Sequence, residues 1–258
     1  MADMPAATVG PETISEWESR QEELRARLET HDRLDFEWRE RGAAKGFVGL
    51  ARVGGIDISY PRGCTGRAVA ALAILEYPSM KILYEISELV PIAAPYVAGY
   101  LAFREMEAYQ AVFGRLMAEK PELLPQVVLV DGNGTLHPRR FGSACHVGVE
   151  LGIPTVGVAK NFIHIDDLHT DARALKERFK ADSQLAEVEL SGDAGIYGMA
   201  IAPKGHATNP IFVSSGHRVS LGTAVKLVRA CSLHRVPEPI RIADLSSRVI
   251  SRRMEAEL

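Results

Sequence analysis

The clearest candidate for chemistry is an acid at the end of an apolar run. Asp131 follows Val127–Val130, an uninterrupted aliphatic run that is typical of a buried parallel strand. Ligands bind at such strand ends in open α/β sheets. Gly132 and Gly134 come next, and residues without a side chain let the backbone turn and approach a ligand closely. The pattern indicates phosphate chemistry assisted by a metal ion.

Basic residues follow this turn and recur near the end of the chain. His137, Arg139 and Arg140 bring positive charge beside the acid, and Arg248 begins a basic group that continues to Arg253. All are candidates for contact with the phosphates of a nucleic-acid backbone. For the arginines, ordinary solvated surface charge is the alternative.

Three further acids lie in segments with clear periodicity. Asp57 lies between two isoleucines in the strand-like Val53–Tyr60, and alternation places it on the face opposite them. A solvent-facing acid and an acid of a buried site both fit that pattern. Glu105 lies inside a long helical pattern, and Asp244 lies near the start of the last one. Each acid alone is weak evidence for a site.

The composition is that of an ordinary soluble globular protein, with 258 residues, 47% apolar and 24% charged. The net charge of −3 excludes a global basic field, so attraction to nucleic acid would need local basic clusters or bound cations. Three widely spaced cysteines indicate reduced thiols in the cytoplasm or nucleus. No signal peptide or long apolar run is present, so we expect no membrane contact.

The elements that must position these residues make one mixed α/β domain over residues 13–258, after a disordered N-terminus at 1–12. Ser15 and Glu18 form a capping box that starts a helix reaching about His31. An antiparallel three-strand meander follows. The expected elements after the first helix are strands at 53–60, 67–77 and 80–91, a helix at 97–120, a strand at 127–130, a helix at 141–151, a strand at 155–158, a helix at 172–180, a hairpin of 195–202 and 210–214, a helix capped by Ser220, and a final helix.

The order of the acids matters more than any one of them. They fall on the first strand, the first long helix, the fourth strand and a late helix, which is a ribonuclease H-like pattern. In that fold the ends of the first and fourth strands lie side by side. We therefore expect a ribonuclease H-like mixed sheet, a meander plus parallel strands, flanked by helices.

The sequence motifs resemble those of the endonuclease V family, which cleaves nucleic acid near inosine. The resemblance rests on VGGIDISY at 53–60, PYVAGYLAFRE at 95–105, the stretch VLVDGNGTLHPRRFGSACHVGVELGIPTVGVAK at 128–160, SSGHRVSL at 214–221 and RVPEPIRIADLSSR at 235–248. The DGNG motif, the tail with Asp244 and the N-terminal helix resemble the eukaryotic branch, whose members prefer inosine-containing RNA. The set is far more specific than a single acid.

The resemblance implies four metal-binding acids: Asp57, Glu105, Asp131 and Asp244. Mg²⁺ prefers such oxygen ligands, and Mn²⁺ is a possible substitute. In a two-metal scheme, with ions about 4 Å apart, one ion activates a water and the other stabilises the leaving 3′ oxygen. The resemblance also implies catalytic roles for Lys160 and His217; a surface lysine and a structural histidine are the alternatives.

Base recognition is also implied by the resemblance. Tyr96, within the segment Pro95-Tyr96-Val97-Ala98, would fill the stack vacated by an extracted inosine, and packing at a helix start is its alternative. Val97 and Ala98 replace the Ile-Pro of other branches. Gly132 and Gly134 would line the base pocket, where backbone N–H groups would read the carbonyl that distinguishes inosine from adenosine.

The implied activity is cleavage on the 3′ side of inosine, at the second phosphodiester bond, in single-stranded RNA and in deoxyinosine DNA, leaving 3′-hydroxyl and 5′-phosphate ends. One alternative is a catalytically silent inosine-RNA-binding protein, against which the four acids argue. The other is a ribonuclease H-like nuclease of different specificity, against which Tyr96 and the two glycines argue. Nothing in the sequence identifies a protein partner.

Overall fold

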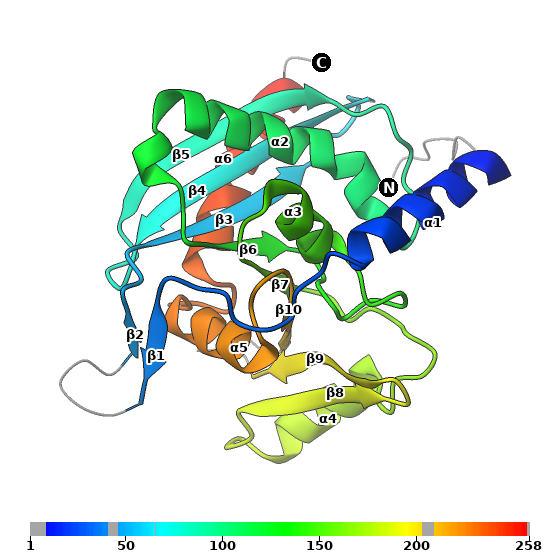
Figure 1. The fold of residues 1–258 in the computed structure, drawn as a ribbon, viewed down its shortest axis with the longest axis vertical. Coiled ribbons are helices and arrows are strands. Elements are labelled where there is room, and N and C mark those ends of the chain that lie inside the picture. The colour runs from blue at the N-terminus through cyan, green and yellow to red at the C-terminus, as the bar shows by residue number, and fades with distance from the viewer. Residues whose placement is uncertain (1–8, 41–45, 65, 203–208, 257–258) are drawn as a thin grey trace.

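The computed structural model describes residues 9–40, 46–64, 66–202 and 209–256. Within them, eight strands form one mixed sheet in the order β5-β4-β3-β6-β7-β10-β9-β8, and β1 and β2 form a separate ribbon (Figure 1). The strands are β1 (Glu37–Arg39), β2 (Gly46–Val48), β3 (Arg52–Ser59), β4 (Arg67–Glu76), β5 (Ile82–Pro91), β6 (Val127–Asp131), β7 (Thr155–Ala159), β8 (Glu187–Gly192), β9 (Gly195–Ile201) and β10 (Ile211–Ser215).

The centre of the sheet has the predicted ribonuclease H-like order. β3, β4 and β5 form an antiparallel meander, β6 pairs parallel with β3, and β7 pairs parallel with β6. β10 and β9 then continue the sheet in the antiparallel sense, as the predicted hairpin requires. The fold class expected from the order of the elements is therefore confirmed.

Helices cover both faces of the sheet. They are α1 (Pro11–Arg25), α2 (Leu101–Glu119), α3 (Ser143–Leu151), α4 (Ala172–Ala181), α5 (Leu221–Ala230) and α6 (Glu238–Ala256), with a short 3₁₀ helix, η1 (Pro121–Leu123), after α2. α2 and α3 pack on the face that carries Ile56 and Val130, while α5 and α6 pack on the face that carries Val53 and Leu129. α1 packs on α3 through Leu24, which is fully buried.

Burial on both faces explains why the parallel strands are apolar throughout. In β6 the residues Val127–Val130 are all inaccessible to solvent, two on each core. In β3, Gly55 lies directly beneath α6, because a Cβ at this position would be 2.1 Å from the Pro239 carbonyl carbon. The face of β3 that carries Asp57 is thus covered by α6 and is not open to solvent.

Several expected boundaries differ from those observed. α1 begins at Pro11, inside the segment expected to be disordered, and ends at Arg25; residues 1–8 lie outside the described residues. α2 begins at Leu101 and not at 97, because Gly99 has φ +82° and interrupts the helical pattern. The apolar Met117 near the end of α2 is 49% exposed and does not join the core. Most of the loop expected at 203–209 also lies outside the described residues.

Three strands were not predicted: the short β1 and β2 of the separate ribbon, and β8. β8 falls between the expected helix at 172–180 and the expected hairpin, and its inward residues Val188 and Leu190 alternate with exposed glutamates. Such alternation is typical of a strand with one solvated face. The polar residues are explained by its position at the edge of the sheet.

Candidate active site

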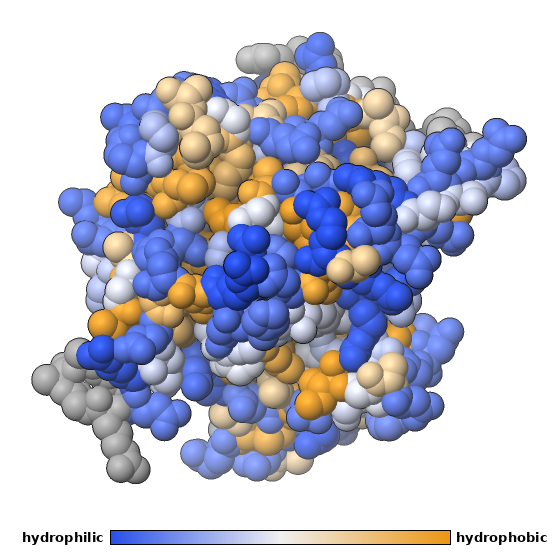
Figure 2. Space-filling model, in the orientation of Figure 1, coloured by the Kyte–Doolittle hydropathy of each residue, from blue (hydrophilic) through white to orange (hydrophobic). Residues whose placement is uncertain are grey.

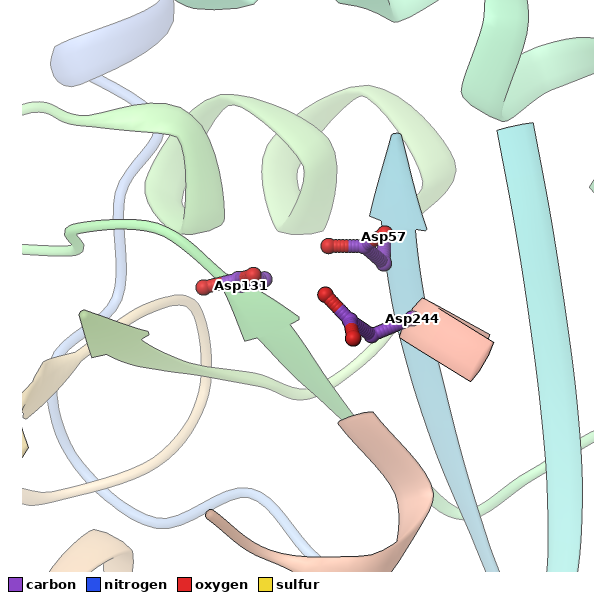
Figure 3. Close-up of side chains that lie close together, drawn as sticks. All are labelled: Asp57, Asp131 and Asp244. Carbon is purple, nitrogen blue, oxygen red and sulfur yellow. The ribbon is translucent and has the colours of Figure 1, made fainter. Parts of the chain in front are cut away.

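Three aspartates from three elements meet at one end of the central strands. Asp57 lies near the end of β3, Asp131 ends β6, and Asp244 lies on α6. Asp57 and Asp131 share the strand parity of Val53 and Leu129, so both side chains point to the face on which α6 packs. Figure 3 shows the carboxylates of Asp57 and Asp244 directed toward the space beside Asp131. One carboxylate oxygen from each lies within 4.8 Å of the others.

Lys160 supplies positive charge to this cluster from the residue after β7. Its Nζ lies 2.6 Å from Asp131 Oδ2 and 3.0 Å from Asp244 Oδ1. Burial lowers the pKa of Lys160, but the charges of Asp131 and Asp57 and the bonds to Asp131 and Asp244 outweigh burial, and its pKa is raised overall. The ammonium is therefore held in its charged form among the acids. Such a position differs from that of an ordinary surface lysine.

Asp57 is the most buried acid of the cluster, with 5% of its surface exposed. Burial raises its pKa to about 8, and the hydrogen bond and charge of Asp131 add to that effect. Ser247 of α6 donates its hydroxyl to Asp57 Oδ2 at 2.9 Å. Sequence reasoning missed Ser247, although it lies three residues after Asp244 on the same helix face.

Glu105 lies outside the group of three aspartates. It projects from α2, which covers the opposite face of the sheet, and its carboxylate accepts hydrogen bonds from Tyr60 Oη at 2.9 Å and Tyr109 Oη at 3.2 Å. Burial raises the pKa of Glu105 to about 7, which these two bonds oppose and the charge of Asp131 reinforces. Neither tyrosine was predicted from the sequence to contact Glu105, although Tyr109 is its i+4 neighbour on the helix.

The chemistry of the cluster fits a hard divalent cation. Three carboxylates crowd together, and Lys160 and Arg248 are the cations that bond to them within the described residues. Burial is the main cause of the raised pKa of Asp57, and the nearby Asp131 raises it further despite the opposing charge of Lys160. Carboxylate oxygens without histidine or thiol ligands favour Mg²⁺ or Mn²⁺ over zinc.

The structure does not bring His217 to these acids. Its backbone N–H donates to Thr155 Oγ1, and its carbonyl accepts the Thr155 N–H at 2.9 Å. Thr155 begins β7, whereas Asp131 pairs with Val158 near the other end of that strand. His217 Nδ1 accepts the Glu29 N–H, and burial lowers the pKa of the ring to about 4. These contacts describe a structural histidine at the end of β7 opposite to the acids.

A small pocket lies beside the turn that follows Asp131; we call it the glycine-turn pocket. Its volume is about 140 Å³, and its lining includes Tyr96, Gly99, Gly132, Asn133, His137 and Ser143. Tyr96 is 65% exposed at its mouth, whereas Pro95 and Val97 are half-buried and Ala98 is exposed. Packing at a helix start therefore does not account for Tyr96. Asn133, which sequence reasoning passed over, has a buried side-chain oxygen without a hydrogen-bond partner among the described residues.

The two glycines have different tasks. A Cβ on Gly134 would lie 1.9 Å from the Ser215 carbonyl oxygen, and its N–H already donates to Ser214 Oγ at 2.9 Å. Gly134 is thus required for the close approach of the turn to β10. Gly132 lines the glycine-turn pocket and has space for a Cβ, but its N–H donates to the Val158 carbonyl. Neither N–H is free to read a base carbonyl in this structure.

The basic residues after the turn are engaged with the protein itself. Arg139 donates to the Gly99 carbonyl at 2.6 Å and lies over the Tyr100 ring. Arg140 donates to the carbonyls of Ala194, in the turn between β8 and β9, and Ile196, in β9. Burial lowers the pKa of His137 to about 4, so its ring is neutral at pH 7. Arg248 donates to Asp244 and keeps 54% of its side chain exposed. Of these four, Arg248 is the best placed to meet a phosphate.

The remaining surface offers no competing acid cluster among the described residues. A pocket of about 760 Å³ lies where β3 and β6 begin and is lined by residues such as Phe113 and Met117, none of them a predicted site residue. The face in Figure 2 is largely hydrophilic, with apolar residues in small separate patches. None of the described helices combines the length and hydropathy needed to cross a membrane.

The chain matches the family model described as Endonuclease V over residues 36–245. Endonuclease V from Mus musculus is 42% identical in a match that covers 100% of this chain and 75% of the mouse protein. Endonuclease V from Homo sapiens is 42% identical in a match that covers 94% of this chain and 85% of the human protein. The catalytic domain of human endonuclease V is similar in structure, with TM-score 0.85, 41% identity, and 95% of this chain and 98% of that chain covered.

A second solved structure carries a ligand. Endonuclease V from Ciona intestinalis, in complex with a 23mer DNA containing an inosine followed by a ribo-adenosine, has TM-score 0.86 and 36% identity. The match covers 96% of this chain and 100% of that one. The family match at residues 36–245 includes the three aspartates and, apart from Gln21 on α1, the residues that line the glycine-turn pocket.

Proposed function

The chain belongs to the endonuclease V family, and on that premise we propose that it cleaves nucleic acid on the 3′ side of inosine, at the second phosphodiester bond. The observation that carries the proposal is the convergence of Asp57, Asp131 and Asp244 with Lys160 beside a pocket of base-compatible size. One short turn, Gly132–Gly134, connects the acids to the pocket. Recognition of the base and cleavage of the backbone are thus joined by three residues.

The three aspartates would hold the divalent cation, with Glu105 approaching from the α2 side of the sheet. Such a cation, when bound, lowers the pKa of water and stabilises the leaving 3′ oxygen. The chain itself contributes a fixed ammonium: Lys160 would orient the attacking water or neutralise the scissile phosphate. Ser247 would keep the Asp57 carboxylate in place through its hydroxyl. The expected products are a 3′-hydroxyl and a 5′-phosphate.

The glycine-turn pocket would receive the extracted hypoxanthine. Tyr96, exposed at the mouth, would stack in the place of the base that leaves the strand. Because the N–H groups of Gly132 and Gly134 are already bonded, the base carbonyl must be read by another donor. Ser143 lines the pocket as the first residue of α3, and N–H groups in the first turn of a helix carry partial positive charge.

We propose inosine in single-stranded RNA as the main substrate, with deoxyinosine DNA as a second one. Support comes from the likeness to the animal enzymes and from the Ciona intestinalis complex, whose strand carries a ribo-adenosine after the inosine. A cytoplasmic or nuclear location follows from the reduced cysteines, of which Cys145 and Cys231 are buried.

The test is incubation with four matched oligonucleotides, RNA and DNA, each with adenosine or inosine, in Mg²⁺ or with a chelator. We expect inosine-dependent, chelator-sensitive cutting that is faster in RNA. A DNA strand with one ribonucleotide after deoxyinosine would show whether a single 2′-hydroxyl suffices. Absence of an inosine-dependent cut in every strand would refute the proposal.

Variants then separate binding from cleavage. Asp57→Ala and Asp131→Asn are expected to abolish cutting while inosine strands still bind in the presence of Ca²⁺. Cleavage by either variant at a near-normal rate would contradict the assignment of the acids. The alternative of a silent inosine-binding protein predicts that the unaltered chain binds but does not cut.

A further inference from the structure

The N-terminal helix α1 places one polar side chain inside the molecule. Gln21 has 4% of its surface exposed and lines the glycine-turn pocket, although the family match begins only at residue 36. Its Nε2 donates to the carbonyl oxygens of Gly99, at 3.2 Å, and Phe141, at 3.0 Å. Its Oε1 accepts a hydrogen bond from Arg139 Nε. Both donors and the acceptor of the amide are therefore used.

The two carbonyls bonded by Gln21 belong to two different segments that line the pocket. Gly99 follows the segment that carries Tyr96, and Phe141 lies just before the N-terminus of α3. Both residues line the pocket. Within the described residues, no strand pairing or helix connects the two segments directly, and the side-chain amide of Gln21 bridges them through these two hydrogen bonds.

Several side chains form hydrogen bonds to the backbone of Gly99. Besides Gln21, the Arg139 guanidinium donates to its carbonyl at 2.6 Å, and a hydrogen bond from His137 reaches the same backbone. Its φ of +82° favours glycine, and a Cβ there would lie 2.8 Å from Arg139 Nη2. The residue that ends the Tyr96 segment is thus anchored by side chains from α1 and from the turn after Asp131.

Packing alone would not require glutamine here. Leu24, on the same face of α1, reaches the apolar cluster of Phe141, Cys145 and Val149 without a polar atom. Burying an amide costs free energy that its hydrogen bonds must recover, whereas an apolar side chain avoids that cost. Hydrogen bonds are directional, so the two bonds donated by Gln21 fix the positions of the Gly99 and Phe141 carbonyls relative to each other.

We propose that Gln21 is a positioning residue for base recognition, which makes α1 part of the recognition site. By bridging Gly99 and Phe141 it sets the width of the glycine-turn pocket and the position of the segment that carries Tyr96. This inference rests on the proposed function. It predicts an effect on substrate affinity and on choice of base, because the acids and Lys160 do not touch Gln21.

The test compares three variants in steady-state cleavage of inosine and adenosine RNA. Gln21→Met keeps the length but removes all three bonds, and Gln21→Glu keeps the acceptor for Arg139 but replaces the donor. The control is Arg20→Met, which removes a neighbouring tie of α1 to Glu150 on α3 without touching the pocket. We expect both Gln21 variants to raise KM for the inosine strand about tenfold, with kcat changed less than about twofold, and to lose preference for inosine.

Amide hydrogen exchange of the metal-free proteins gives a readout that needs no substrate. We expect faster exchange at residues 96–100 in both Gln21 variants and not in Arg20→Met. If the unaltered chain cuts no inosine strand, the proposed function fails. The amide exchange rates at residues 96–100 still show whether the hydrogen bonds of Gln21 hold this segment in place. The inference is overturned if Gln21→Met has the KM and the exchange rates of the unaltered chain, or if Gln21→Glu has its KM. It is also overturned if Arg20→Met raises KM as much as the Gln21 variants do.

Discussion

Lys160 Nζ lies 2.6 Å from Asp131 Oδ2, so the ends of two adjacent parallel strands are tied by an ion pair in the middle of an acid cluster. The same ammonium lies 3.0 Å from Asp244 on α6. Lys160 thereby balances part of the charge of the aspartates that α6 and the strands bring together. A divalent cation would compete with it for the same carboxylates.

Replacement of Lys160 should therefore move cation affinity and activity in opposite directions. Lys160→Met removes one positive charge from the cluster, so Ca²⁺ should bind several-fold more tightly in calorimetry without nucleic acid. Cutting of inosine RNA should nevertheless slow on the order of 10²–10³-fold in kcat, as for loss of one electrostatic contact to the transition state. Arg248→Met, which removes an exposed cation bonded to Asp244, is the control and should slow kcat far less. Unchanged kcat in Lys160→Met would leave the lysine a purely structural role.

The two glycines of the turn should respond differently to a methyl group. Gly134→Ala brings a Cβ to 1.9 Å from the Ser215 carbonyl, and we expect a loss of roughly 1–3 kcal/mol or more in the free energy of unfolding. In Gly132→Ala the new Cβ meets Ser143 Cβ at an ordinary 3.4 Å, so the fold should persist while the pocket narrows. Urea unfolding and the ratio of inosine to adenosine cleavage measure the two effects. Equal stability of the two variants would contradict the close approach to β10.

Tyr96 should matter for the substrate and not for the fold. With 65% of its surface exposed, Tyr96→Ala should leave the thermal unfolding temperature nearly unchanged. Loss of a stacking ring should weaken binding of inosine RNA by about 1–3 kcal/mol, measured in Ca²⁺ by fluorescence anisotropy. Tyr96→Phe retains the ring and should bind like the unaltered chain. A large fall in unfolding temperature with unchanged binding would return Tyr96 to a packing role.

Buried histidines should make the protein lose stability in mild acid. Burial lowers the pKa of His146 to about 4, so between pH 6.5 and 4 the unfolded chain takes up a proton that the folded chain refuses. The free energy of unfolding should then fall with falling pH by up to about 1.4 kcal/mol per unit for this residue. His146→Phe keeps a ring against Phe103 and removes the buried Nδ1, which has no partner among the described residues. Urea titrations at several pH values should show a shallower slope in the variant, and an unchanged slope would contradict the shift.

Local periodicity in the sequence predicts β3 to β7, β9, β10 and the six α-helices, whereas β1, β2 and β8 were not predicted. Val127–Val130 could only be a buried strand, and Asp131 therefore had to emerge at its edge. Ser220 was identified as a helix cap for a similarly local reason, since its hydroxyl accepts the Thr223 N–H. The order of these elements was enough to predict the ribonuclease H-like sheet.

Only the tertiary structure decided which of the predicted site residues meet. Asp57 receives a hydrogen bond from Ser247, 190 residues away, because α6 packs across the face of β3 that alternation alone left open. Glu105 approaches the aspartates from the other face, because α2 packs there, and His217 lies beyond the far end of β7. Side-chain periodicity assigns a residue to a face of its own element, whereas the partner of that face is selected by the packing of segments distant in sequence.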